Sequence, residues 1–445
     1  MLEPAYQADV VVVGAGIAGL AAAHRLTSAG VTTTVLEAAH EVGGRMSTEK
    51  VDGFRLDRIG QLMSTSYPEL RMTPGLDALA LCSFAPGVLL HSDGHRHRVG
   101  APALQGGARG ALHAVRALAS APRPASAPRT PLGTAVDQAR LAAALARIAG
   151  TPVERLLTRA ESPAGQALTE RGLPGRAVES FLRPLLAALL CDPELTGSSR
   201  SADLALHSFA SGRLCVPEGG AEALPQLLAR SLPPGTVRTG VRVTSVSTTS
   251  VTTAEHGVLR CRAILLATGA GTAAGLLPGL RVPDTHPVTV VHHTTDRPPA
   301  TGGALVLDAD RGGPVAHTAV VSAVDPTRAP AGRALISSTV LGTPPPDLDT
   351  AVRTHLARLY GTSTANWETL AVHHTPDAVP ATRPPYDPGR PVRLLAGLYV
   401  CGDHRDAGST VQAALRSAAR ATASLLADLG AAGSLHRADP LPTAA

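Results

Sequence analysis

Aromatic residues make up only 2% of the 445 residues, and lysine occurs once, at position 50. Proteins that bind nucleic acid by stacking need aromatic platforms beside clustered basic residues. The arginines of this chain are instead scattered, so its net charge of +5 does not indicate a nucleic-acid partner. We therefore expect no nucleic-acid binding.

Paired cysteines are also absent. The five cysteines form no CxxC pair and lie far apart, at positions 82, 191, 215, 261 and 401. This spacing argues against both a disulfide framework and a zinc site. We expect reduced thiols and no metal.

Long apolar runs are missing too, because no stretch of about 18 uncharged apolar residues occurs. The N-terminal segment MLEPAYQADVVVVGAG has no basic residues before its apolar run, unlike a signal peptide. These features predict no membrane span and a cytoplasmic location. The length exceeds the size at which one hydrophobic core stops growing, which favours two domains.

The glycines at positions 14, 16 and 19 form GxGxxG between the apolar run DVVVV and the helical segment LAAAHRLTSAG. In this context Gly14 permits a tight turn, Gly16 lets a pyrophosphate approach the backbone, and Gly19 lets helix and strand pack closely. Glu37 ends the next strand-like run, VTTTVLE, where a carboxylate accepts ribose hydroxyls and repels a 2′-phosphate. The segment predicts a βαβ unit that binds a dinucleotide.

A second glycine pair follows Glu37 in VLEAAHEVGGRM. Gly43 and Gly44 remove side chains where the backbone would pass the pyrophosphate again, and Arg45 offers a fixed fork of donors to its oxygens. Nicotinamide enzymes do not usually need this second pass. The order of carboxylate, glycine pair and arginine favours a different dinucleotide.

The segments GAGIAGLAAAHRL and LEAAHEVGGRM resemble the flavin amine oxidase superfamily, which includes protoporphyrinogen oxidases and carotenoid desaturases. The resemblance implies FAD as the cofactor. Near residue 217, PEGGAEALPQLLA is similar to the family's Pro-x-Gly-Gly segment, and Val243 matches the position that contacts adenine through its backbone. The closing strand GLYVCGD implies Asp403 beside the ribityl-phosphate region.

TVQAALRSA is similar to the family's helix that begins under the flavin ring, which implies this place for Val411 and Gln412. The N-terminus of such a helix stabilises the negative charge of reduced flavin. The residues assigned to the cofactor are Gly14, Ala15, Gly16, Gly19, Glu37, Ala38, Gly44, Arg45, Gly60, Val243, Gly402, Asp403, Val411 and Gln412.

We therefore expect an α/β fold with a Rossmann-like FAD-binding domain, a mixed-sheet substrate domain and a helical insert. The helical insert is expected from Ala/Leu/Arg-rich segments such as GARGALHAVRALA, and the proline-rich ASAPRPASAPRTPLG is expected to be a loop. The expected divisions are 1–75, 206–285 and 386–430 for the FAD-binding domain, 76–205 for the insert, 286–385 for the substrate sheet, and 431–445 for a tail.

Several positions depart from the family pattern. Ala413 and Ala418 replace glycines, and the family's Asp-x-Gly becomes Asp57-Arg58-Ile59, with Gly60 one step later. Arg58 is either a ligand for a substrate carboxylate or a solvated strand residue. The wall strand HPVTVVHHTTD has no lysine, no aromatic ring lies at 408–412, and HHTPDAVPATRP has no cysteine for flavin attachment. FAD is therefore expected to bind non-covalently.

Few side chains are needed for catalysis, because the flavin itself accepts the hydride. We expect Gln61 to face the flavin. His292 and His293 alternate faces on the wall strand, so one of them can act as a base, and His293 is our candidate. His404, next to Asp403, is another candidate; a buried, hydrogen-bonded histidine is the competing interpretation for each.

The sequence thus predicts an FAD-dependent oxidoreductase that removes a hydride from a C–N or C–C bond of a small organic molecule in specialised metabolism, with oxygen as reoxidant. An amine or amide oxidase and a carotenoid-type desaturase remain unresolved, since the Ala/Leu-rich insert suits either an apolar tunnel or a plain core. A redox-neutral isomerase and a non-catalytic FAD-binding scaffold are further alternatives. The oligomeric state is left open, a homodimer included.

Overall fold

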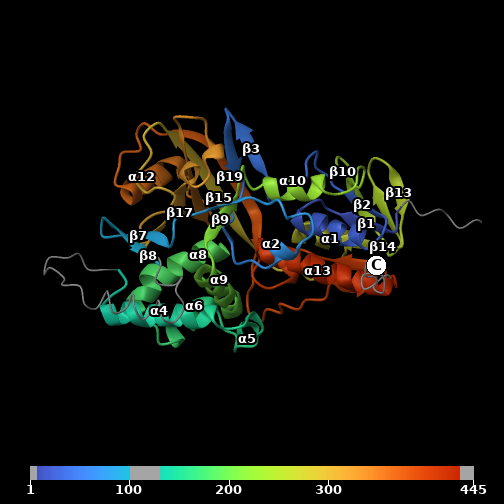
Figure 1. The fold of residues 1–445 in the computed structure, drawn as a ribbon, viewed down its shortest axis with the longest axis horizontal. Coiled ribbons are helices and arrows are strands. Elements are labelled where there is room, and N and C mark those ends of the chain that lie inside the picture. Colours follow the sequence, from blue (N-terminus) through green and yellow to red (C-terminus); the bar gives the residue numbers. More distant parts are fainter. Residues whose placement is uncertain (1–7, 101–130, 431–445) are drawn as a thin grey trace, which may run out of the picture.

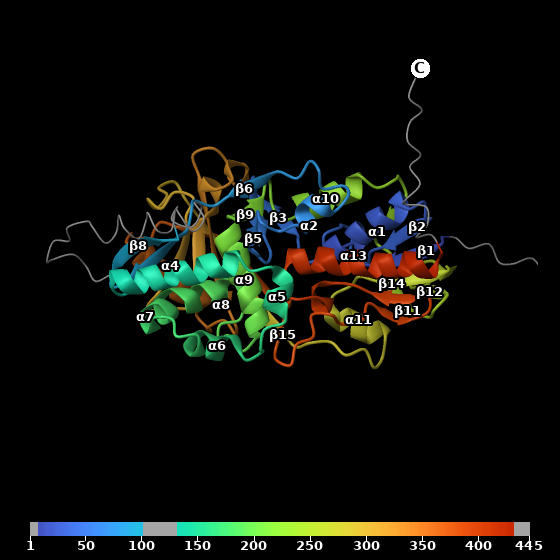
Figure 2. The same cartoon turned by 60° about the horizontal axis from the view of Figure 1, so that its bottom comes forward.

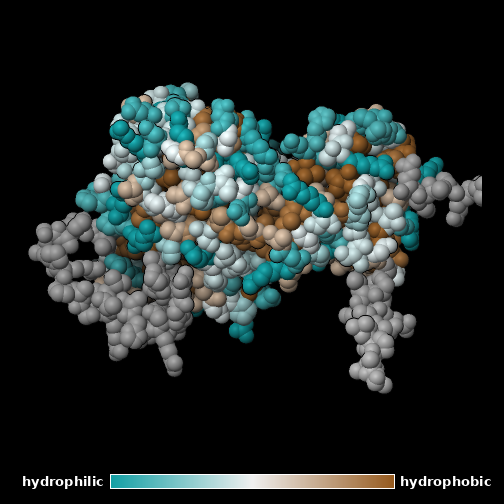
Figure 3. Space-filling model, turned by 45° about the horizontal axis from the view of Figure 1, so that its top comes forward, coloured by the Kyte–Doolittle hydropathy of each residue, from teal (hydrophilic) through white to brown (hydrophobic). Residues whose placement is uncertain are grey.

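The computed structural model describes residues 8–100 and 131–430. Two sheets lie at opposite ends of an elongated molecule, with the long helix α13 (Val411–Asp428) running along one end (Figure 1). On the face in Figure 3, hydrophobic residues gather across the middle, between more hydrophilic ends. No helix among the described residues is long and apolar enough to cross a membrane.

The first sheet has six strands in the order β10-β2-β1-β14-β21-β20, all parallel except the last pair. Its strands are β1 (Val10–Val13), β2 (Thr33–Leu36), β10 (Val237–Arg238), β14 (Ala263–Leu266), β20 (Arg393–Leu395) and β21 (Leu398–Val400). Because three distant segments supply these strands, the sheet is complete only after the whole chain has folded.

The two faces of this sheet are covered differently because β1 is apolar on both sides. Val10 and Val12 pack with α1 (Ile17–Ser28), α10 (Ala223–Arg230) and α13. Val11 and Val13 pack toward the small antiparallel sheet, which consists of β11 (Val243–Val246), β12 (Ser250–Thr253) and β13 (Gly257–Arg260). Figure 2 shows α1 and α13 side by side, with α11 (Ala270–Leu276) on the other side of the strands. A strand buried on both faces is typical of a parallel sheet.

The second sheet has seven strands in the order β19-β15-β18-β17-β16-β7-β8, of which only β16 and β7 are parallel neighbours. Its strands are β7 (Val88–Ser92), β8 (His95–Val99), β15 (Thr285–Thr295), β16 (Leu305–Asp308), β17 (Val315–Val320), β18 (Ala334–Leu341) and β19 (Glu368–Pro380). Val306 packs toward α12 (Leu348–Tyr360), whereas Leu305 and Leu307 pack toward the helical region.

The helical region lies against this second face of the seven-stranded sheet. It comprises α4 (Ala135–Ala149), α5 (Val153–Leu157), α6 (Ala164–Glu170), α7 (Gly175–Ala177), the π-helix η1 (Val178–Leu182), α8 (Arg183–Leu190) and α9 (Ser199–Ser211). Thr134 and Asp137 form a capping box that starts α4. Phe181 and Phe209 pack in the core of the helical region, with their ring centroids 6.2 Å apart.

The predicted α/β fold with a Rossmann-like domain, a mixed sheet and helices is confirmed. The expected helical insert is wrong for residues 81–99, which form β6 (Leu81–Ser83), β7 and β8. Asp93 and Gly94 make the tight turn between β7 and β8, both with positive φ, and a DG pair between strand-like runs is typical of a hairpin. The predicted helix at 107–119, most of the predicted loop at 119–133 and the tail at 431–445 lie outside the described residues.

Short elements connect the two halves of the molecule. They are β3 (Thr48–Val51), β4 (Phe54–Asp57), β5 (Met63–Ser64), α2 (Glu69–Met72) and β9 (Leu214–Pro217), with β9 joining β5 and β6 in a three-stranded sheet.

Candidate functional site

A cavity of about 380 Å³ opens where the parallel sheet meets the seven-stranded sheet. Many separate segments line it, among them the glycine loop before α1, residues 36–46, residues 57–61, residues 267–272, the end of β19, and the start of α13. The residues predicted to bind the cofactor therefore largely converge on one site.

Each glycine of the loop has a distinct environment. Gly14 adopts a φ of +104°, and its N–H donates to the Leu36 carbonyl at 2.7 Å. A Cβ on Gly19 would lie 2.0 Å from the Gly14 carbonyl oxygen, so only glycine lets α1 pack this closely on the loop. A Cβ on Gly16 would meet no protein atom within 4 Å, and Gly16 lines the cavity, which leaves the backbone open to a ligand.

The Glu37 carboxylate closes one side of the glycine loop. One oxygen accepts the Ala15 N–H at 2.7 Å, and the other accepts the Ala39 N–H at 2.9 Å. Glu37 and Ala38 line the cavity, whereas Ala15 is fully buried and contributes its backbone. A fixed carboxylate at the end of β2 is where a dinucleotide's ribose hydroxyls are bound.

The second glycine pair returns to the first loop. The Gly43 N–H donates to the Ala15 carbonyl at 2.9 Å, and Gly43 and Gly44 both have positive φ. A Cβ on Gly44 would lie 3.7 Å from the Cα of Gly16. The backbone therefore passes the phosphate-side loop twice, as the sequence predicted.

Arg45 joins three parts of the cavity wall. Its guanidinium donates to the Asp403 carboxylate at 2.7 Å and to the Ala378 carbonyl, in β19, also at 2.7 Å. Burial lowers the pKa of Arg45, but the adjacent Asp403 carboxylate outweighs burial and raises it, so the guanidinium stays charged. The Arg45 guanidinium was expected to donate to phosphate. In the structure, one of its nitrogens donates to Asp403 instead.

The start of α13 points into the same cavity. Thr410 caps the helix by accepting the Ala413 N–H at 3.3 Å, and Thr410, Val411 and Ala414 line the cavity. Gly402 and Asp403 line it as well. The N-terminus of an 18-residue helix carries a partial positive charge, which suits an anionic group.

The side chain of Gln412 turns to the other side of the helix. Its carbonyl oxygen accepts the Glu69 N–H at 3.0 Å, and Gln412 lines the second cavity described below rather than this one. Ala413 and Ala418, at the family's glycine positions, are fully buried and line neither of the two described cavities.

Gly60 and Gln61 also line the cavity. Gly60 has a φ of +46°, and the Gln61 amide donates to the Ser409 carbonyl at 3.0 Å, which holds this loop against the start of α13. Val243 lines the cavity beside Val241 and Arg242. The side chain of Arg58 is 56% exposed and lies 3.6 Å from Glu49, as expected for a solvated residue.

The structure does not bring the candidate histidines to the cavity. His293 is fully buried beside Trp367, with Nε2 3.4 Å from Asp349 on α12. His292, on the opposite face of β15, lies 3.0 Å from the Asp57 carbonyl and 2.9 Å from the Ser337 hydroxyl. His404 is fully buried and does not line the cavity. Burial lowers the pKa of all three to about 4, so they are neutral at pH 7.

A second cavity of about 280 Å³ lies between α2, α8, α9 and residues 407–416. Sequence reasoning missed its position, because its lining comes from five separate segments, which lie within residues 62–72, 153–154, 189–190, 201–214 and 407–416. Among the described residues, Thr410 alone lines both cavities. Most of its lining is apolar, including Leu62, Leu189, Leu204 and Phe209.

Ser201 adds a polar group to this apolar second cavity. Its hydroxyl is buried and has no hydrogen-bond partner among the described residues. A buried hydroxyl without a partner costs free energy, so it is a natural contact for a ligand.

The described residues fit a dinucleotide with a polar, anionic middle. They supply a glycine loop with an open side at Gly16, a fixed carboxylate at Glu37, the Arg45 cation, and the start of α13. Lys50 is not part of this arrangement, since it pairs with Glu222 at 2.9 Å and its side chain is 60% exposed.

The family described as "Flavin containing amine oxidoreductase" matches residues 17–426. The chain therefore belongs to this family, whose members are flavin-containing oxidoreductases. The superfamily inferred from the glycine loop and the second glycine pair is confirmed.

Curated relatives match only in short segments. A putrescine oxidase from Kocuria rosea is 45% identical over 98 residues, 21% of this chain and 20% of the relative. A 4,4'-diapophytoene desaturase (4,4'-diaponeurosporene-forming) from Staphylococcus haemolyticus is 54% identical over 48 residues, 11% of this chain and 10% of the relative. These alignments thus span no more than a fifth of either relative.

Solved structures match over most of the chain. An oxidoreductase from Methanosarcina mazei has a TM-score of 0.70 at 16% identity and covers 92% of this chain and 99% of its own. A putrescine oxidase with bound putrescine has a TM-score of 0.68 at 20% identity, covering 95% and 100%. A reduced UDP-galactopyranose mutase has a TM-score of 0.66 at 14% identity, covering 96% and 98%. At these identities the likeness establishes the fold.

Proposed function

We propose that this member of the flavin containing amine oxidoreductase family binds FAD non-covalently and oxidises a C–N or C–C bond of a small organic molecule in specialised metabolism, with oxygen as reoxidant. The observation that carries the proposal is the meeting of two cavities at Thr410, one polar and suited to a dinucleotide, the other mostly apolar.

Several contacts support FAD as the flavin. FAD has an adenosine half, and the Glu37 carboxylate stands where its ribose hydroxyls would bind. Val243 lines the part of the cavity where we expect the adenine. Gly16, Gly44 and Arg45 line the part where we expect the pyrophosphate. None of the five cysteines lines the cavity, which supports non-covalent binding.

When bound, flavin supplies the hydride-accepting chemistry. The protein's part is to orient the substrate and to exclude water. The start of α13, capped by Thr410, directs backbone N–H groups into the cavity and stabilises negative charge there. Gln61, held by Ser409, faces the same space as a neutral donor or acceptor.

None of the three candidate histidines is placed as a base in this arrangement, since His292, His293 and His404 line neither described cavity. His207 does line the second cavity, and burial lowers its pKa. The reaction that suits these residues is hydride removal from a substrate whose own nitrogen or conjugated system stabilises the cation. The apolar second cavity favours a mostly apolar substrate, with one polar group near Ser201.

A carotenoid-type desaturase is the second candidate, favoured by the apolar lining of the second cavity. A redox-neutral isomerase and a non-catalytic FAD-binding scaffold are the two alternatives to both the oxidase and the desaturase. The substrate's polarity separates the first two, because an oxidase of the amine or amide type needs a nitrogen next to the oxidised carbon.

Purified protein, heat-denatured to release its cofactor, should yield FAD identified by its mass. Candidate molecules are then added under argon. Bleaching of the flavin absorbance, followed by peroxide release in air, supports an oxidase, whereas bleaching without peroxide supports a dehydrogenase or desaturase. A product of unchanged mass identifies an isomerase. A colourless protein that FAD does not reconstitute would refute the proposal.

The role of the second cavity is tested by Ala205→Phe, which places a ring in it from α9. Flavin content should be unchanged, while kcat/KM falls about tenfold or more, equivalent to about 1.4 kcal/mol. An unchanged kcat/KM would exclude this cavity as the substrate site.

A further inference from the structure

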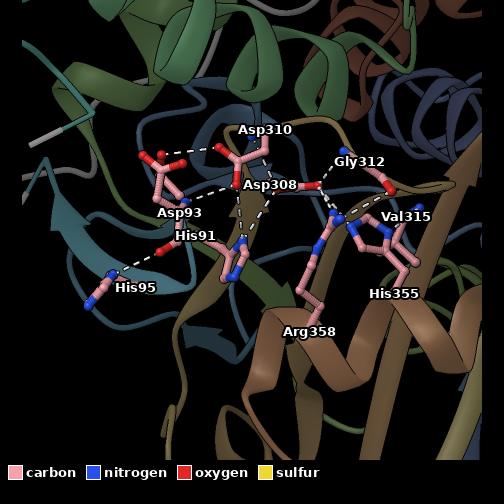
Figure 4. A network of polar contacts seen from close by, with 10 residues as sticks. His91, Asp93, His95, Asp308, Asp310, Gly312, Val315, His355 and Arg358 are labelled. Atoms are coloured by element: carbon pink, nitrogen blue, oxygen red, sulfur yellow. Dashed lines mark hydrogen bonds and ion pairs between the residues drawn. The ribbon is translucent and has the colours of Figure 1, made fainter.

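Three metal-ligating side chains meet at one end of the seven-stranded sheet, away from both cavities. Strands β7 and β16 are parallel neighbours, and their register places His91 opposite Asp308. Asp310 follows β16 by two residues and turns back toward the β7–β8 hairpin (Figure 4). None of the three lines the cofactor cavity or the second cavity.

His91 is buried without a hydrogen-bond partner. It is 2% exposed, and neither ring nitrogen makes a hydrogen bond within the described residues. Its Nδ1 lies 3.5 Å from an Asp308 oxygen and 3.8 Å from an Asp310 oxygen, beyond the range of about 2.7–3.2 Å for N–H···O bonds. A buried imidazole aimed at two carboxylates, but too far away to bond them, calls for a bridging group.

The gaps match the size of a metal ion. Zinc binds nitrogen and oxygen at about 2.0–2.2 Å in a tetrahedron, which places neighbouring ligand atoms about 3.4 Å apart. The Nδ1–oxygen distances of 3.5 and 3.8 Å are close to this spacing, and all three ligand atoms lie within 4.8 Å of one another. An ion would bond to atoms that cannot bond to each other.

Surrounding groups hold the Asp308 carboxylate in place. One of its oxygens accepts the Gly312 N–H at 2.8 Å and is contacted by His355 at 2.9 Å and by Arg358 at 2.8 Å (Figure 4). The His355 Nδ1 accepts the Val315 N–H, so the other ring nitrogen, Nε2, is the donor to Asp308. The other oxygen accepts the Asp310 N–H at 3.1 Å and faces His91. Partners that orient a ligand in this way are typical of metal sites.

The Asp310 carboxylate is oriented as well. One of its oxygens accepts the Ser92 hydroxyl at 3.1 Å, and the other accepts the Asp93 N–H at 3.0 Å. Its side chain is 36% exposed, which leaves room for water as a fourth ligand.

We propose that His91, Asp308 and Asp310 bind one divalent transition-metal ion, zinc in the first instance, which ties the β7–β8 hairpin to the loop after β16. One imidazole and two carboxylates suit zinc and its neighbours, whereas calcium takes six to eight oxygens. The expectation of no metal rested on the spacing of cysteines, which carries no information about this donor set.

The test uses the untagged, flavin-loaded protein after removal of metals by a chelator. Zinc binding is measured by competition with a chromophoric chelator, together with the thermal midpoint with and without zinc. Wild-type protein should bind one zinc per chain at this site and gain thermal stability. His91→Gln should weaken this binding more than about 100-fold, because even changes to the partners of metal ligands cost up to about that factor.

Two further variants keep the test decisive. Asp310→Asn retains an oxygen of the same shape but loses its charge, so it should weaken zinc binding about tenfold or more, even if His91→Gln fails to fold. His95→Gln changes an exposed histidine on neighbouring β8 and should bind zinc as the wild type does. Equal zinc affinity in Asp310→Asn and wild type would overturn the proposal, as would stabilisation by magnesium but not by zinc.

Discussion

In the half of the molecule built on the parallel sheet, the charged side chains Glu37, Arg45 and Asp403 line an open cavity. In the half built on the seven-stranded sheet, His292 and His293 turn into the protein interior, and the nearby second cavity is mostly apolar. The first half thus presents its polar groups to a ligand, while the second half buries them. We therefore expect charge and hydrogen bonds to dominate binding in the first cavity, and apolar contact to dominate binding in the second.

The largest effect is expected from Gly19→Ala, which tests the packing of the parallel-sheet half. The new Cβ would lie 2.0 Å from the Gly14 carbonyl oxygen, so α1 must move and the protein should lose at least about 3 kcal/mol of stability. Thermal unfolding without flavin measures this loss.

Gly16→Ala is the matched control for this change. Its Cβ meets no protein atom, so the apoprotein should keep its stability while flavin binding weakens. Equal destabilisation by the two substitutions would contradict the separate roles of these glycines.

Acidification should weaken mainly the seven-stranded half. Burial lowers the pKa of His292, His293 and His317 from 6.5 to about 4, so between these pH values the unfolded chain binds more protons than the folded protein. The stability that they contribute is full above pH 6.5 and falls as the pH drops toward 4, by on the order of 3 kcal/mol per histidine.

Urea unfolding at several pH values measures this slope. His317→Leu should reduce it, whereas substitution of the exposed His95 should leave it unchanged. A slope equal in wild type and His317→Leu would show that His317 is not held neutral.

Charge removal in the cofactor cavity should have a smaller effect. Glu37→Ala or Arg45→Ala should lower flavin affinity about tenfold for each lost contact of about 1.4 kcal/mol. Flavin absorbance per purified chain measures the occupancy. Glu41→Ala, in the same segment but exposed, is the control, and full occupancy in both test variants would refute their assignment.

The smallest effect is expected from Ser201→Ala in the second cavity. Its hydroxyl has no partner, so the variant should be as stable as wild type or more stable. The KM for the substrate should rise, by up to about tenfold if one hydrogen bond is lost.

Ser199→Ala, on the same helix, provides the opposite pattern. Its hydroxyl accepts the Ser162 N–H and lines neither cavity, so this variant should lose stability and keep its KM. A KM unchanged in Ser201→Ala would remove Ser201 from the substrate contacts.

The glycine loop and Glu37 were predictable because their roles depend on a few residues close together in sequence. Gly14, Gly16 and Gly19 each need their special backbone or space within one turn between strand and helix. The second glycine pair was predictable for the same reason, since its contact with Ala15 follows from a short return of the chain.

The histidines and the second cavity were not predictable in this way. Alternation along β15 shows that His292 and His293 face opposite sides, but α12 and β4 decide what each side contains. The second cavity forms from five segments whose meeting depends on the whole fold. The hairpin at 88–99 did carry a local signal, the Asp93–Gly94 turn, which the Ala/Leu-rich composition around it obscured.

Thr410 borders the two cavities and caps the helix that separates them. If a ligand in one cavity shifts Thr410, the affinity of the other cavity for its own ligand changes too. Thermodynamic reciprocity then requires that flavin tightens substrate by the same factor by which substrate tightens flavin. Thr410 would thus couple the binding of flavin to the binding of substrate.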